Sequence, residues 1–291
     1  MPAAFAHDLY GRKVYLEVNP KIKQIIRKER YCFLLGVHGP DVLFFYRALG
    51  KNRVNQKGVR LHREAASGIF QEGRKEILKA ANREERNALM AYLLGISCHY
   101  ALDHSLHGYI NRKESETGIT HAQIETELER RLLTRENMRP LHSNLTCHLK
   151  NTKQTRMAAS RIFKEDMGVI SEAIASFRTM NRLFINSSET TKKAVCAVLK
   201  LTGNYSTIYG MLMRKNPVPG CGEMTDYLEQ HFFEAVPYGA KLAEGLYRYL
   251  NGHGPLPEEF GGNFNGEAAP ETAVAASVAA VSVPDGKTTA M

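Results

Sequence analysis

The chain has 291 residues, of which 43% are hydrophobic and 24% are charged, with no enrichment in Gly or Pro. This is an ordinary globular balance, sufficient for one large core or two modest ones, and no apolar stretch is long enough to cross a bilayer. The formal net charge of +9 favours anionic partners such as phosphate esters, nucleic acid or acidic lipid surfaces. A solvated basic surface without a partner remains an alternative, because the Lys and Arg residues are scattered.

The cysteines and the N-terminus predict a cytoplasmic protein. The chain has five cysteines, an odd number, at wide spacings and without a C-x-x-C pair: Cys32, Cys98, Cys147, Cys196 and Cys221. This pattern is typical of reduced thiols and not of a disulfide framework. The first ten residues lack the basic segment and apolar run of a secretory signal. We therefore expect contact with a membrane from one side at most, and no obligate protein partner is evident.

Helical spacing of apolar residues dominates the chain and predicts an all-α fold, a multi-helix bundle. The segments with this spacing, in chain order, are 20–35, 62–82, 84–110, 153–185, 188–214 and 224–251. Breaks are predicted at 36–41 and at 216–222, which are rich in Gly and Pro. We expect a single domain over residues 1–261. Residues 262–291 are mostly Ala, Val, Thr and Gly and are expected to form a disordered tail.

Metal-binding residue types recur at helical spacing between residues 98 and 128. His99, Asp103 and His107 lie four residues apart, and His121 and Glu125 repeat the same step after a loop that Thr120 can cap. A step of four turns the helix by only about 40°, so each set lies along one side of its helix. Imidazoles and carboxylates together suit zinc. The sequence therefore predicts that the chain binds more than one metal ion.

Two alternatives avoid a metal. A single histidine on an apolar helix, such as His99, often bonds to a carbonyl in the core. Asp103 lies inside the apolar run 94–106, where a buried carboxylate requires a cation or several hydrogen-bond donors. An Arg or Lys from another helix could meet that need instead of a metal.

Three stretches together resemble the zinc-dependent phospholipase C family, whose all-helical fold is shared with fungal single-strand nucleases. They are Leu94-Gly-Ile-Ser-Cys-His-Tyr-Ala-Leu-Asp-His-Ser-Leu-His-Gly-Tyr-Ile110, the run 121–128 with its His-x3-Glu spacing, and the run 35–46 around Asp41. The resemblance covers about residues 1–150 by motif. It implies a cleft that holds two or three zinc ions.

The resemblance also implies a role for each ligand. Asp41 looks like a carboxylate at the first zinc and a candidate general base. His62, His99 and Asp103 look like the other ligands of that ion, with Asp103 bridging to the third. His107, His121 and Glu125 look like the ligands of the second zinc, and His7 looks like the histidine of the third.

The family's last ligand is the mature N-terminal residue, which in its best-known members is a tryptophan exposed by signal cleavage. This chain has no tryptophan. We hypothesise that Met1 is removed and that the imino nitrogen of Pro2 takes this place. Two further departures are the short step from Asp103 to His107 and the presence of Val42, where the phosphocholine-specific enzyme has an aromatic residue.

The predicted activity is zinc-dependent hydrolysis of an anionic phosphodiester, with a lipid head group or a nucleotide as substrate. A nuclease or nucleotidase of the same fold would need aromatic residues for base stacking in the cleft. A non-catalytic helical protein with structural zinc is the third possibility, although eight ligands for two or three ions leave open positions. Outside this set, His38 is expected to be structural, and His142 and His148 are expected at the surface.

Overall fold

The computed structural model describes residues 3–186, 188–201 and 209–267, and within these ranges the chain forms helices and no β-strand. This confirms the predicted all-α fold. In chain order the elements are α1 (Ala4–Glu17), α2 (Pro20–Lys28), α3 (Arg30–Gly36), η1 (Gly39–Phe45), α4 (Arg53–Arg63), α5 (Ser67–Leu78), α6 (Arg83–Thr117), α7 (His121–Arg135), α8 (Lys153–Phe163), α9 (Met167–Asn186), α10 (Glu189–Leu201), α12 (Gly222–Glu234), α13 (Val236–Leu250) and η2 (Glu258–Gly261).

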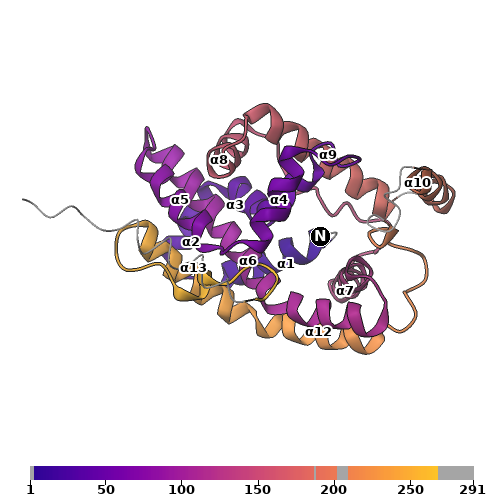
Figure 1. The fold of residues 1–291 in the computed structure, drawn as a ribbon. Coiled ribbons are helices and arrows are strands. Elements are labelled where there is room, and N and C mark those ends of the chain that lie inside the picture. Colours follow the sequence, from indigo (N-terminus) through magenta and orange to yellow (C-terminus); the bar gives the residue numbers. More distant parts are fainter. Residues whose placement is uncertain (1–2, 187, 202–208, 268–291) are drawn as a thin grey trace, which may run out of the picture.

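Helix α6 is the centre of the molecule, and most of the other helices pack around it (Figure 1). Its N-cap is Asn82, whose side chain accepts a hydrogen bond from the backbone N–H of Glu85, and its C-cap is Gly118, which has a φ of 71°. Every residue from Ala88 to Asp103 is buried. A helix that is buried on all sides contacts many partners, and α6 touches α1, α3, α5, α7, α8, α12, α13 and η1. Side chains from distant parts of the sequence therefore meet beside it.

Two glycines let the backbone of α3 lie directly against the backbone of α6. A Cβ placed on Gly95 would lie 2.4 Å from the carbonyl oxygen of Phe33, and one placed on Gly36 would lie 2.2 Å from that of Tyr92. Neither neighbour can move away, because both are backbone atoms of packed helices. This close contact positions η1, which follows α3 directly.

We expect Gly95→Ala to lower the free energy of unfolding by about 3 kcal/mol, at the upper end of overpacking effects. Gly108→Ala is the matched control on the same helix, because a Cβ there meets nothing within 4 Å. That control should stabilise the protein by about 0.5–1 kcal/mol through helix propensity. Urea unfolding of both variants gives the comparison, and equal stability of the two would contradict the close packing of α3 on α6.

Several helices differ from the predicted segments. Helix α1 was not predicted, because residues Ala4–Gly11 are all buried and carry no amphipathic pattern. Helix α4 and η1 were also missed. The segment 153–185 is two helices separated at Lys164, which has a φ of 50°, and 224–251 is divided before Pro237. The predicted helix 188–214 is described as α10 to Leu201, and residues 202–208 lie outside the described part of the chain.

The folded part extends beyond residue 261, where we expected the tail to begin. Phe264 is fully buried and Asn263 is 3% exposed, and the Asn263 carbonyl accepts a hydrogen bond from His104 Nδ1 at 2.9 Å. Residues 262–267 therefore belong to the folded unit, and residues 268–291 lie outside the described residues. Among the helices that the structure describes, none has the length and apolar character required to span a membrane.

Candidate metal centre

Helix α6 presents His99, Asp103 and His107 on successive turns, as their spacing predicts. Asp103 lies between the two histidines, with its Oδ2 3.2 Å from His99 Nε2 and its Oδ1 3.4 Å from His107 Nε2. All three side chains are buried, and His99 is completely inaccessible. Because the carboxylate faces both neighbours on its own helix, it is placed to share metal ions with each of them.

Helix α7 adds His121 and Glu125 from the opposite side. It starts with a capping box between Thr120 and Gln123, which confirms Thr120 as the N-cap. Glu125 Oε1 lies 3.2 Å from both His121 Nε2 and His107 Nε2. His121 Nδ1 is 2.9 Å from Asn111 Oδ1, a partner on α6 that orients the ring and leaves Nε2 free to bind a metal.

Asp41 and His62 come from η1 and α4. Asp41 Oδ1 lies 2.9 Å from His62 Nε2 and 3.9 Å from His99 Nε2. His62 Nδ1 is 2.8 Å from the Gly58 carbonyl oxygen, which fixes its ring. The turn before Asp41 requires glycine, since Gly39 has a φ of 47° and a Cβ there would lie 2.5 Å from the His99 ring.

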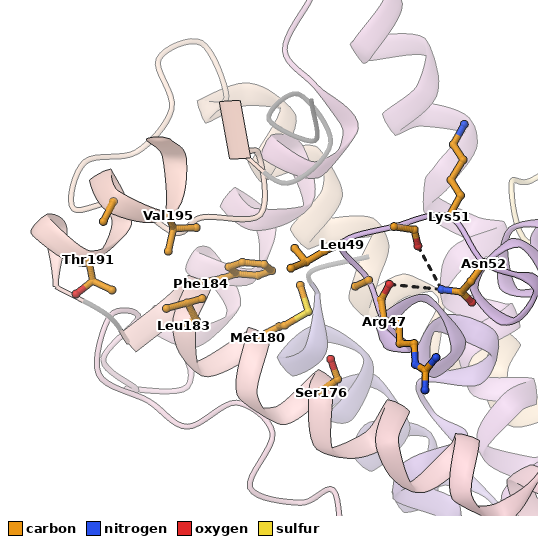
Figure 2. Close-up of a pocket in the computed structure, with 13 residues that line it drawn as sticks. Arg47, Leu49, Lys51, Asn52, Ser176, Met180, Leu183, Phe184, Thr191 and Val195 are labelled. Carbon is orange, nitrogen blue, oxygen red and sulfur yellow. Dashed lines mark hydrogen bonds between the residues drawn. The ribbon is translucent and has the colours of Figure 1, made fainter. Parts of the chain in front are cut away.

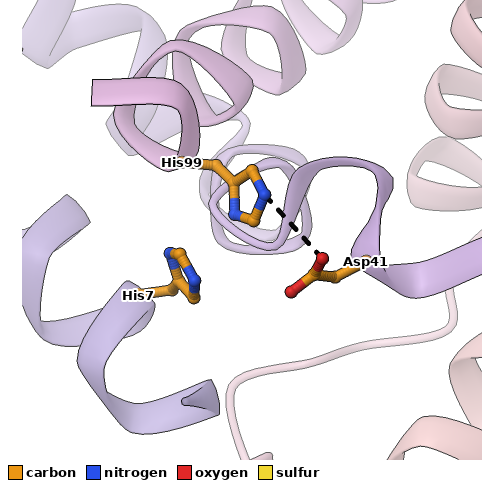
Figure 3. A group of neighbouring side chains, drawn as sticks. All are labelled: His7, Asp41 and His99. Carbon is orange, nitrogen blue, oxygen red and sulfur yellow. Dashed lines mark ion pairs between the residues drawn. The ribbon is translucent and has the colours of Figure 1, made fainter. Parts of the chain in front are cut away.

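His7 reaches the same place from α1. Its Nε2 is 3.4 Å from Asp103 Oδ1, and its ring is 4.4 Å from that of His99 between centroids. Figure 3 shows His7, His99 and Asp41 pointing toward one another from three different elements. Helix α1 places this residue beside α6, although the two segments are about ninety residues apart in sequence.

Three groups of these side chains have ligand atoms close enough together to share an ion. The groups are His7, Asp41 and His99; His62, His99 and Asp103; and His107, His121 and Glu125, and within each group the ligand atoms lie within 4.8 Å of one another. A cavity of about 350 Å³ opens beside them. Its lining residues are Asp41, Phe44, Val59, His62, Arg63, Asp103, His107, Asn111, His121 and Asn265. Five of the eight predicted ligands in the described chain line this cavity, and the other three, His7, His99 and Glu125, each belong to a group with one or more of those five.

Unpartnered buried atoms indicate that this space suits a cation. His7 Nδ1, His99 Nδ1, His107 Nδ1 and Asp41 Oδ1 are buried without a hydrogen-bond partner. Asp41 Oδ1 lies 2.9 Å from His62 Nε2, yet these atoms do not have hydrogen-bond geometry. Each such group costs about 1–3 kcal/mol when it stays unpaired. A divalent ion would bind Asp41 Oδ1 together with the Nε2 atoms of the histidines that face the carboxylates, and this mixture of nitrogen and carboxylate oxygen fits zinc.

Burial also sets the protonation states of the centre. It lowers the pKa of His7 and of His107 to about 4, and it lowers that of His99 well below the usual value. These imidazoles are therefore neutral at pH 7, the form that binds metal. Burial, together with the nearby Asp41 carboxylate, raises the pKa of Asp103 well above its usual range. A bound cation would reverse that preference and keep Asp103 ionised.

Glu129 belongs to this region, although sequence reasoning did not select it. It is fully buried and accepts a hydrogen bond from the backbone N–H of Phe5, at a helix start that no side chain of α1 caps. Burial raises its pKa to about 8. The signal was present in the sequence, since Glu129 continues the four-residue step of His121 and Glu125. It joins α7 to the first turn of α1 and so supports the position of His7.

Four of the histidines outside the metal-binding set are His38, His104, His142 and His148. His38 is buried, and its Nε2 lies 2.7 Å from His148 Nε2, so the expectation that His148 lies at the surface is wrong. The two rings stack, and Asp8 lies 3.9 Å from the other side of His148. His142 is exposed, as expected. His104 stacks on Tyr100, away from the metal-binding residues.

A larger cavity, of about 870 Å³, lies between the loop after η1 and helices α9 and α10 (Figure 2). Apolar side chains such as Leu49, Met180 and Phe184 project into it, and it contains none of the predicted metal ligands. Because size alone supplies no chemistry, the smaller polar cavity is the candidate active site.

A family model described as zinc dependent phospholipase C matches residues 2–176, more than half of the chain. The chain belongs to the zinc-dependent phospholipase C family. This confirms the resemblance in the three sequence stretches and, at family level, a zinc hydrolase of the phospholipase C type. Neither curated proteins nor solved structures gave a match. Pro2 lies outside the described residues, so its role as a metal ligand in this phospholipase C-type centre remains a prediction.

Proposed function

We propose that the chain is a zinc-dependent phosphodiesterase and that its ligands are His7, Asp41, His62, His99, Asp103, His107, His121 and Glu125, with Pro2 as a further ligand. The observation that carries this proposal is the convergence of three metal-binding groups on one open cavity. Two or three zinc ions match the three groups. Zinc held there supplies a Lewis acid that activates water and offsets negative charge on a phosphate.

In the proposed reaction, a water oxygen forms a bond to phosphorus, and the bond from phosphorus to the glycerol oxygen on the lipid side breaks. The water supplies one proton to the leaving oxygen, and the products are a phosphomonoester and an alcohol. Asp41 is the candidate base, because its carboxylate lines the cavity and can orient and deprotonate the water. The tilted ring of Phe44 packs against His62 and excludes solvent from one wall.

The cavity lining favours a phospholipid or small phosphodiester over a nucleic acid. Among the described residues that line it, Phe44 is the one Phe, Tyr or Trp, and its ring lies 5.0 Å from the His62 ring. Base stacking would require more aromatic surface than this. The cavity also disfavours purely structural zinc, since closed structural sites leave no space beside the ion.

The direct test is metal analysis of the purified full-length protein together with hydrolysis assays. We expect bound zinc, together with hydrolysis of bis(p-nitrophenyl) phosphate and of phospholipid vesicles that a chelator abolishes and added zinc restores. Single-stranded DNA is the comparison substrate, and its preferred cleavage would favour the nuclease alternative. Zinc binding without hydrolysis of any phosphodiester would favour structural metal and contradict the proposal.

A further inference from the structure

Arg63 is a permanent positive charge at the mouth of the candidate active site. It follows His62 at the end of α4, lines the cavity of about 350 Å³ and is exposed to solvent. It is the one Arg or Lys among the lining residues. Within the described part of the chain its guanidinium has no ion-pair partner.

The carboxylates of the cavity are turned toward histidines instead. Asp41 faces His62 at 2.9 Å, and Asp103 faces His99 at 3.2 Å. By contrast, Arg60 on the same helix is paired with Glu64 at 3.2 Å. Arg63 therefore remains available to an anion that enters the cavity, with a geometry suited to carboxylate or phosphate.

The same wall is unsuitable for a cationic head group. A quaternary ammonium ion requires several faces of Trp, Tyr or Phe, and within the described lining only Phe44 is of these types. Val42, which follows Asp41 directly, is aliphatic and fully buried, so it adds no aromatic face to the cavity. A choline group would therefore meet the guanidinium of Arg63 without compensation from aromatic rings.

The segment after η2 holds polar groups beside this arginine. Asn263 Nδ2 donates to the Arg63 carbonyl oxygen at 3.5 Å, and Asn263 Oδ1 accepts from the backbone N–H of Asn265 at 3.0 Å. Asn265 itself lines the cavity. Asn265 and Arg63 thus border the same cavity, where an amide and a guanidinium can both donate to the charged oxygens of an acidic head group.

We propose that Arg63 determines specificity and that the cavity takes phosphodiesters whose head group carries a second negative charge. This inference rests on the proposed function for the identity of the reacting phosphate. The guanidinium would bind the second anionic group while the phosphodiester occupies the metal centre. Hydrogen bonds to a charged partner are worth enough to change affinity by about tenfold.

Three phosphonates of similar length provide the test by calorimetry on the full-length, zinc-loaded protein. They are 3-phosphonopropionate, propylphosphonate and (2-trimethylammonioethyl)phosphonate, which differ in the charge of the far end. We expect the carboxylate to bind about tenfold more tightly than the propyl compound, and the ammonium compound to bind most weakly. Arg63→Gln should remove this order, whereas Arg63→Lys should retain part of it.

Arg60→Gln is the control, because it removes an exposed arginine of α4 that is paired with Glu64. Zinc content and thermal stability should match the wild type in all three variants. Equal binding of the three phosphonates, a preference for the ammonium compound, no binding, or an unchanged order in Arg63→Gln would overturn the inference. Binding does not depend on turnover, so an absence of hydrolysis would contradict the proposed function separately.

Discussion

Replacing Asp103 with asparagine is expected to lower phosphodiesterase activity by at least about a thousandfold, or ~4 kcal/mol of transition-state stabilisation. Asp103 Oδ1 lies 3.4 Å from both His7 Nε2 and His107 Nε2, and Oδ2 lies 3.2 Å from His99 Nε2. The side chain therefore joins the metal-binding groups. An amide of the same shape keeps the packing and removes the charge that would bridge two ions. Steady-state assays with zinc analysis measure the effect.

The stability of this variant separates a metal role from a packing role. Asn is a close match for protonated Asp103, the form that burial favours without a cation. We therefore expect the metal-free variant and metal-free wild type to be similarly stable, and only the zinc-loaded proteins to differ. Asp226→Asn is the control, since Asp226 is 63% exposed and pairs with Arg131 on the surface. Full activity of Asp103→Asn would refute the assignment.

Removal of zinc is expected to lower the melting temperature by about 10 °C. An ion present at a thousand times its dissociation constant adds about 4 kcal/mol, which corresponds to roughly 8–16 °C for a domain of this size class. Without it, the carboxylates of Asp41, Asp103 and Glu125 remain buried close to one another, and Asp41 Oδ1 has no hydrogen-bond partner among the described residues. Thermal unfolding with and without a chelator measures the shift, and magnesium should restore less of it than zinc.

The Asp103→Asn variant provides the control for chelation, because it lacks the carboxylate that joins the groups. Its melting temperature should fall less on addition of chelator than that of the wild type. An unchanged wild-type melting temperature would contradict a metal that is held by the folded chain.

Helix boundaries could be predicted where one face of the helix is apolar and the other polar, or where a capping residue is present. The spacing of apolar residues placed most of α6, and Thr120 marked the start of α7. Helix α1 escaped prediction because its first residues are buried on every side. The break at Lys164 also escaped, since a lysine with a φ of 50° carries none of the usual Gly or Pro signal.

Some residues of the candidate site could be predicted from local spacing, and others could not. Periodicity alone placed His99, Asp103 and His107 on one side of a helix, and His121 and Glu125 on one side of another. Asp41, His62 and His7 entered through resemblance to the family, because no local pattern connects them to α6. Glu129 and Arg63 were missed, since only packing shows what each one faces.

The sequence by itself determined the helical character of this protein and the face of each helix that carries metal-binding side chains, because both follow from local periods of about 3.6 residues. The tertiary structure decided which of those faces meet. Close contact of α3 with α6 at Gly36 and Gly95 brings η1 against His99, and α1 is held beside α7 by Glu129. These contacts join segments far apart in the chain, and no local pattern encodes them. They also place Arg63, which has no ion-pair partner among the described residues, beside the metal-binding side chains.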